Sequence, residues 1–295
     1  MGITLHEDPN NPDKSYVVLQ KGMQWHNVVD EIVKMREEAI KSGAMIRREF
    51  PFYGTINTVS TPMNNNQASQ QNQIISDWSG NGRMAGQELT VWTENQKIPM
   101  VMDKIDKDIN EGFNVIVVVE SVSDKPVYQD PDGVVATKAS LERRGLPLTI
   151  KRTHPGTAKL LSSMLNKKGI GHSKIYGPGT SRKIKEVEKF QSNENKVAIM
   201  TATSGGTGIN LDDQTGERPR RMYVLTVNYS GDVVEQVTGR VSRRKTTTPA
   251  YMEMIVLDGA ENDSKRMDII TKKIGTLRSV QHGGDVDMEA LKRLE

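Results

Sequence analysis

A segment of apolar runs around a glycine-rich turn, residues 196–244, most constrains the fold of this 295-residue chain. An apolar run at 197–200 meets a Thr/Ser/Gly turn at 201–208, and a second apolar run follows at 222–227. Short continuous apolar runs are typical of strands that are buried on both faces of a parallel sheet. Because the loops that follow such strands form ligand sites, the pattern predicts an α/β domain with a site after the first run.

A polar segment after the second run carries the most informative spacing. If residues 232–244 are helical, Gln236, Arg240 and Arg243 stand at i, i+4 and i+7 and share one face. Gly239 has no side chain beside Arg240, so another backbone could approach closely there. Arginine is a permanently charged fork that suits phosphate oxygens. The alternative for this segment is a basic surface helix that makes ordinary ion pairs.

These two features together resemble the motifs of a known family. The sequence QxxGRxxR at 236–243 resembles motif VI of superfamily 2 helicases and translocases, and GGTGINL at 205–211 resembles their motif V in its Snf2-type form. The block 97–275 further resembles the C-terminal helicase region of the strawberry notch family. After QxxGRxxR the chain continues RKTTT, without the Gly-Gln that many Snf2 proteins place there, so the subfamily stays open.

The resemblance implies a RecA-like lobe, the second of two lobes that enclose ATP. In the family the first lobe carries the P-loop and holds most of the Mg²⁺ ligands. No Gly-Lys pair occurs in this sequence, so the P-loop consensus is absent. We therefore expect ATP and Mg²⁺ to be held by a P-loop lobe in the same or another chain. The resemblance makes Arg240 and Arg243 arginine fingers, with Gln236 orienting them.

Further positions follow from the same resemblance. Residues expected at the ATP cleft, or to couple it to nucleic acid, are Gly206, Gly208, Asn210, Asp212 and Gly239. Residues expected to contact nucleic acid are Ser121, Gly177, Thr180, Ser181, Arg182 and Thr201. DNA is expected in preference to RNA.

One of these positions also stands on its own geometry. Gly177-Pro-Gly-Thr-Ser181 opens an expected helix, and the free N–H groups at a helix start bind anions. The alternative is plain N-capping by the hydroxyl side chains.

The order of apolar and helix-spaced segments predicts a three-layer α/β lobe with a parallel sheet. The expected strands are 115–119, 172–176, 197–200, 222–227 and 251–257, and the expected helices are 98–110, 157–168, 181–191 and 261–280.

Outside these elements we expect less regular structure. Residues 1–95 form an extension with a helix near 24–42 and a polar linker at 61–73, residues 96–280 form the lobe, and 281–295 form a tail. Residues 124–154 are a long, basic, irregular passage, which is either a flap for a nucleic-acid strand or a solvated insertion.

The composition of the chain excludes some kinds of site and of location. The formal charge is +3 and there is no cysteine, so no disulfide framework or thiolate metal site exists, and no metal ligand set is evident. No apolar run is long enough to span a bilayer, so we expect an intracellular protein without membrane contact, in cytoplasm or nucleoid and of cellular or phage origin. Two functions remain: the second lobe of an ATP-dependent helicase, or a non-catalytic module that binds nucleic acid or a partner.

Overall fold

The computed structural model describes residues 5–8, 11–17, 34, 38, 56–202, 209–226, 236–237, 239–242 and 246–267. The chain divides into two units, residues 1–49 with 271–295, and residues 50–270. In the first unit, β1 (Leu5–Asp8) pairs antiparallel with β2 (Asn11–Val17). Lys34 and Glu38 are helical, in agreement with the helix expected near 24–42.

A six-stranded sheet forms the centre of the second unit. Its strands are β3 (Ile56–Pro62), β4 (Asn114–Val119), β8 (His172–Ile175), β9 (Val197–Thr201), β10 (Arg220–Val224) and β11 (Ala250–Asp258). Their order is β3-β11-β10-β4-β9-β8, and every neighbouring pair is parallel. Each residue of β4 is buried, as expected for a β-branched run inside a parallel sheet.

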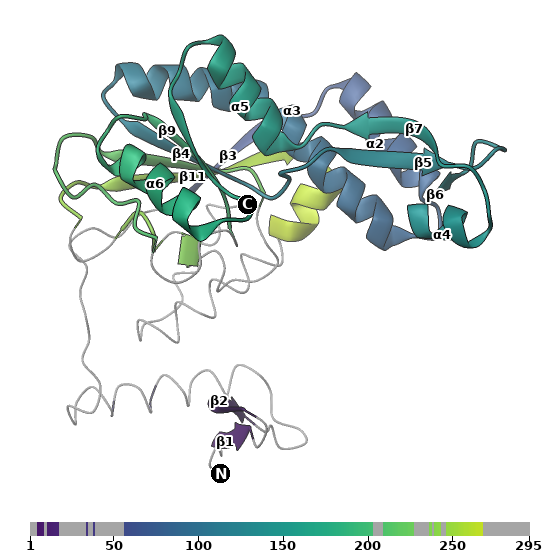
Figure 1. Ribbon diagram of the computed structural model, residues 1–295, viewed down its shortest axis with the longest axis horizontal. Helices are drawn as coiled ribbons and strands as arrows, with labels where there is room; N and C mark the ends of the chain where they lie inside the picture. Colours follow the sequence, from purple (N-terminus) through teal and green to yellow (C-terminus); the bar gives the residue numbers. More distant parts are fainter. Residues whose placement is uncertain are drawn as a thin grey trace. The chain divides into compact units, whose positions relative to one another are not determined.

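Helices cover both faces of this sheet. Val115 and Val117 pack with apolar residues of α3 (Gly82–Asn110) and α5 (Thr157–Lys167). Ile116 and Val118 face the other way and share a cluster with Phe190 of α6 (Thr180–Gln191). Figure 1 shows α5 and α6 on opposite sides of the strands. This is the predicted three-layer α/β arrangement, and it is compatible with a RecA-like lobe.

The expected boundary near residue 95 does not divide the structure, because it falls inside α3. The polar stretch expected as a linker instead ends β3 and forms α2 (Asn65–Asp77). A capping box starts α2, since Asn64 accepts from the Gln67 amide at 2.9 Å and Gln67 accepts from the Asn64 amide at 2.8 Å. Among the described residues, no helix is long and apolar enough to cross a membrane.

The passage expected to be irregular is a small folded arm, residues 120–156. It contains β5 (Lys125–Gln129), β6 (Val135–Ala136), α4 (Lys138–Arg143) and β7 (Thr149–His154). The three strands form an antiparallel sheet in the order β6-β5-β7. In Figure 1 this sheet projects beyond the main sheet and lies along α2. The passage is therefore folded, and the prediction of an irregular passage was wrong.

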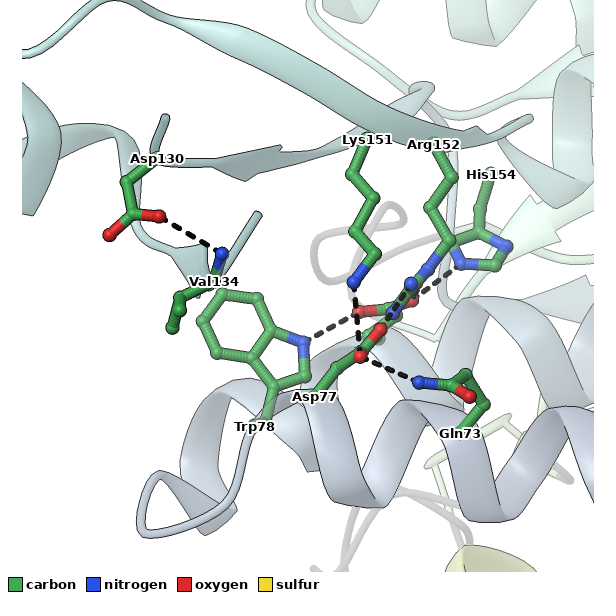
Figure 2. A network of polar contacts seen from close by, with 9 residues as sticks. Gln73, Asp77, Trp78, Asp130, Val134, Lys151, Arg152 and His154 are labelled. Carbon is green, nitrogen blue, oxygen red and sulfur yellow. Dashed lines mark hydrogen bonds and ion pairs between the residues drawn. The ribbon is translucent and has the colours of Figure 1, made fainter. Parts of the chain in front are cut away.

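Two buried carboxylates attach the arm to the helices beneath it. Glu88 of α3 is fully buried and accepts from Trp78 Nε1 at 2.6 Å, from Arg152 Nε at 2.6 Å, and contacts His154 Nε2 at 2.7 Å. Asp77 at the end of α2 pairs with Arg152 and, at 3.2 Å, with Lys151. Figure 2 shows Lys151 and Arg152 pointing from β7 towards Asp77, while His154 beside them contacts Glu88. These contacts replace the solvation that the two carboxylates lose.

The same contacts set the ionisation of these acids. Burial acts to raise the pKa of Glu88, but hydrogen bonds from His154, Arg152 and Trp78 outweigh it and hold the pKa below its ordinary value. A carboxyl whose pKa is lowered by folding stabilises the fold above its unfolded pKa. That stabilisation is lost as the pH falls through the folded pKa.

Glu88→Gln is therefore expected to lower the free energy of unfolding by about 3 kcal/mol at pH 7, because it removes the fully buried one of the two carboxylates that pair with Arg152. The deficit should shrink as the pH falls below the ordinary glutamate pKa and through the lowered pKa of folded Glu88, where the wild-type carboxyl also becomes neutral. Urea unfolding at several pH values measures both effects. Glu142→Gln, which removes an exposed i,i+4 partner of Lys138 on the same arm, should change stability by less than about 0.5 kcal/mol. A pH-independent deficit in Glu88→Gln would contradict the assignment.

Candidate functional site

The carboxyl ends of the parallel strands meet at one edge of the main sheet, here called the carboxyl edge. The expected nucleic-acid residues follow three of these strands: Ser121 follows β4, Gly177 to Arg182 follow β8, and Thr201 ends β9. Because β4, β9 and β8 are neighbours in the sheet, these residues occupy one continuous part of the edge. Loops at this edge are where open α/β sheets bind ligands.

The turn into α6 presents free backbone donors at this edge. Gly177 and Gly179 have φ values of 75° and 95°, a conformation that favours glycine. Gly179 is the N-cap and supplies no side-chain hydrogen bond, while Thr180 and Ser181 are exposed. Hydroxyl N-capping, the alternative expected from the sequence, therefore does not occur at the cap position. The first amides of α6 suit a phosphate group.

The Arg182 side chain does not extend into solvent from this turn. Its guanidinium donates to the Tyr176 carbonyl at 2.6 Å, folding the side chain back over the turn. The side chain still lies at the surface, so its charge stays beside the start of α6.

Ser121 and Thr201 are less accessible than the sequence indicated. They are 9% and 8% exposed. The Ser121 amide donates to Glu94 at 3.0 Å, and its carbonyl accepts from the Ala158 amide at 2.9 Å. The main chain at Ser121 is thus occupied by protein contacts, which leaves the hydroxyl as its group for a ligand.

A buried acid and a buried base of α3 hold the strand ends in place. Glu94 is fully buried, and its two oxygens accept from the Glu120 amide at 2.6 Å and the Ser121 amide at 3.0 Å, directly after β4. Lys97, one helical turn away and 1% exposed, donates to the Leu225 carbonyl at 2.5 Å, directly after β10. One helix face therefore fixes the starts of two loops.

Asp263 completes this contact at a third strand. Its carboxylate lies 2.6 Å from Lys97 Nζ and accepts from the Leu257 amide of β11 at 2.8 Å. Burial raises the pKa of Glu94, although hydrogen bonds from Thr226 and from backbone amides oppose it. Burial lowers the pKa of Lys97, although Asp263 opposes it. Sequence analysis missed this cluster, and its only signal is two opposite charges three residues apart in an otherwise buried helix face.

Arg240 contacts the described residues on either side of the glycine turn predicted after β9. Its Nη2 is 3.5 Å from the Ala202 carbonyl, the last described residue before that turn. The Leu211 amide in turn donates to the Arg240 carbonyl at 2.9 Å, so both flanks of the turn contact this residue. Arg240 is 6% exposed. The arrangement joins the two sequence motifs, and it places this guanidinium inside the protein rather than on its surface.

The helix expected over 232–244 is seen only in part. Gln236 and Val237 are helical, but residues 239–242 form a turn in which the Arg240 amide donates to the Val237 carbonyl at 3.2 Å. Gln236 is exposed whereas Arg240 is buried, so they do not share one exposed face. Gly239 is half-buried within the turn. The other expected residues of this region, Arg243, Gly206 and Gly208, lie outside the described residues.

The structure does not bring Asp212 to the carboxyl edge. Asp212 is fully buried and accepts from Thr246 and Gln214, each at 3.2 Å, among the segments that precede β10 and β11. The Asn210 carbonyl accepts from Gln191 at the end of α6 at 2.8 Å. The segment that begins at residue 209 runs back towards the amino ends of the strands. The contacts of Asp212 and Asn210 hold it there.

No protein-family model matches this chain, and no curated protein is detectably similar to it. The candidate site therefore stands on the geometry of its own residues.

Lys97→Met is expected to lower the free energy of unfolding by about 3–5 kcal/mol, since it leaves the Asp263 carboxylate buried without its cation. The double variant Lys97→Met/Asp263→Asn should recover most of that loss, because a neutral pair replaces an unpaired charge. Denaturant unfolding compares the variants, with Lys168→Met, at a half-exposed ion pair, as a control that changes little. Equal losses in the single and double variants would show that the ion pair is not what matters.

Ser181→Glu is expected to weaken binding of a single-stranded oligonucleotide by on the order of tenfold, because a carboxylate at the start of α6 occupies the anion position. The same change should slightly stabilise the helix, so lost binding would not reflect unfolding. Ser192→Glu puts the same side chain at the exposed C-cap of the same helix and should leave binding unchanged. Fluorescence anisotropy at fixed salt measures both. Equal affinities in the two variants would exclude this turn from the binding surface.

Proposed function

We propose that this chain acts as the second lobe of an ATP-dependent nucleic-acid helicase or translocase. The observation that carries the proposal is that Arg240 contacts the Ala202 carbonyl and the Leu211 amide, which are the described residues on either side of the predicted glycine turn. The parallel α/β sheet supports it, because RecA-like lobes have this architecture. The sequence resemblance supplies the order of the motifs.

In this proposal the carboxyl edge forms part of the nucleic-acid track. The exposed start of α6 offers amides and hydroxyls to a strand phosphate, and the Ser121 hydroxyl adds a second contact after β4. DNA is the proposed strand. Phosphate contacts of this kind position a strand without reading its sequence, as a translocase requires.

The proposed nucleotide is ATP with Mg²⁺, held by a P-loop lobe in the same or another chain. The sequence offers no Gly-Lys pair for a P-loop, so this chain contributes charge to the phosphates rather than a cradle for them. We assign the direct contact with the γ-phosphate to Arg243. Arg240, being 6% exposed, is assigned to positioning the glycine turn beside the nucleotide. Gln236 lies at the surface and orients the arginines when the lobes close.

A second candidate function is a non-catalytic module that binds nucleic acid or docks on a partner. Two observations favour it: the missing P-loop consensus and the burial of Arg240. The two functions differ in the need for arginines at a nucleotide, because a module that only binds has no phosphoryl transfer to stabilise.

Nucleic-acid-stimulated ATP hydrolysis, measured with a P-loop lobe supplied in trans, separates the two functions. Arg243→Ala should lower the rate by on the order of 10³-fold or more, as loss of an arginine finger does. Arg240→Ala should also lower the rate, through the glycine turn. Arg143→Ala, an exposed arginine of α4 on the arm, is the control and should keep full activity.

The pure chain by itself should hydrolyse no ATP. Unchanged turnover in Arg243→Ala with the P-loop lobe present would reject the finger role and favour the binding module. Robust hydrolysis by the pure chain would contradict the division of labour between two lobes.

A further inference from the structure

Glu120 lies at the surface of the carboxyl edge and contacts two buried charged residues, Glu94 and Arg266. Glu120 directly follows β4, and its amide is fixed by Glu94 at 2.6 Å. Its carboxylate is 53% exposed and lies 3.1 Å from Arg266 Nη1, whereas the Arg266 side chain is only 8% exposed. The ion pair therefore joins a buried guanidinium to a carboxylate that water already reaches.

Arg266 is held from the inner side by neutral groups. Its Nη2 donates to the Thr90 hydroxyl at 2.7 Å, and Asn262 donates to the same hydroxyl at 3.1 Å. The Thr90 hydroxyl in turn donates a hydrogen bond to the Gly86 carbonyl at 2.8 Å. These contacts help to orient the guanidinium, and none of them involves Glu120.

We propose that Arg266 is a phosphate-binding residue of the carboxyl edge, and that Glu120 occupies its guanidinium until a phosphate group replaces the carboxylate. The phosphate belongs to a nucleic-acid strand or to a nucleotide, since both carry the same chemistry. The inference rests on the proposed function, because it adds a residue to the same site.

Three physical arguments support this exchange. Arginine binds carboxylates and phosphates through the same fork geometry, so one anion can take the place of the other. The Glu120 carboxylate is 53% exposed and regains hydration when it leaves, and the phosphate that replaces it keeps the buried Arg266 guanidinium paired. The pair stands at the end of β4, next to Ser121, where ligands of parallel α/β sheets bind.

Glu120→Ala separates this exchange from an ordinary ion pair, since the two predict opposite results. If Glu120 only stabilises Arg266, its removal leaves anion binding unchanged. If Glu120 competes with a ligand, its removal should tighten binding by on the order of threefold to tenfold. The probes are a single-stranded oligonucleotide and, separately, inorganic tripolyphosphate, titrated into the full chain at fixed salt.

Glu111→Ala is the matched control. Glu111 is 45% exposed, pairs with Lys107, and caps the C-terminus of α3, ahead of the amino end of β4. Glu111→Ala and Glu120→Ala change the net charge by the same amount, so comparing them separates the local effect at Arg266 from the long-range effect of charge on binding. Arg266→Lys in the Glu120→Ala background removes the fork and should abolish the gain. Circular dichroism checks the fold, and the comparison of the two glutamate variants stands even if the Arg266 variant is unstable.

Each outcome decides the inference. A gain in Glu120→Ala that is absent from Glu111→Ala supports it, and the probe that shows the gain identifies the source of the phosphate. No gain, equal gains in both variants, or no binding by Glu120→Ala overturns it. Oligonucleotide binding by the wild type without a gain would leave the proposed function standing while rejecting the exchange. If Glu120→Ala binds tripolyphosphate more tightly but the chain binds no oligonucleotide, the exchange at Arg266 stands and the proposed nucleic-acid track is rejected.

Discussion

The buried charges of α3 are the constraint on which the carboxyl edge depends. Glu94 and Lys97 lie where water cannot solvate them, so the amides after β4 and the carbonyl after β10 must do so. Such groups destabilise a fold when they are half satisfied and define one arrangement of the backbone when they are fully satisfied. Three strand ends are therefore held relative to one helix, and the loops that carry the candidate ligand residues start from fixed points.

The sequence predicted the central strands of the sheet because they are continuous apolar runs, but it did not predict β3, whose sequence INTVSTP is largely polar. β4 and β9 are buried at every position, and such runs need no partner to be recognised. The sequence prediction started this helix at residue 98, from the helical spacing of Val101, Ile105 and Ile109, and so missed the first half of α3. In the structure the helix continues through Pro99, with Trp92 and Lys97 buried before it and Val101 after it. Packing on both sides of the proline outweighs the backbone hydrogen bond that it removes.

The candidate site was predictable only where it depends on local spacing. Arg240 was found from its motif, and in the structure it contacts the described residues on either side of the predicted glycine turn. The burial of Arg240 and the inward position of Asp212 were not foreseeable, because they depend on the path of the chain after the turn. The ion pair of Arg266 with Glu120 joins residues 146 positions apart, and charge patterning along a sequence carries no information about such pairs.

The arm has a further property that follows from where its chain begins and ends. The Ala158 amide donates to the Ser121 carbonyl at 2.9 Å, so the segment between them leaves the lobe and returns to it at neighbouring points. An insertion of this form lengthens a loop without altering the path of any central strand, and the cost of closing a longer loop rises only slowly with its length. Residues of the arm that do not contact Asp77 or Glu88 can therefore change in number and surface chemistry without a change in the path of any central strand.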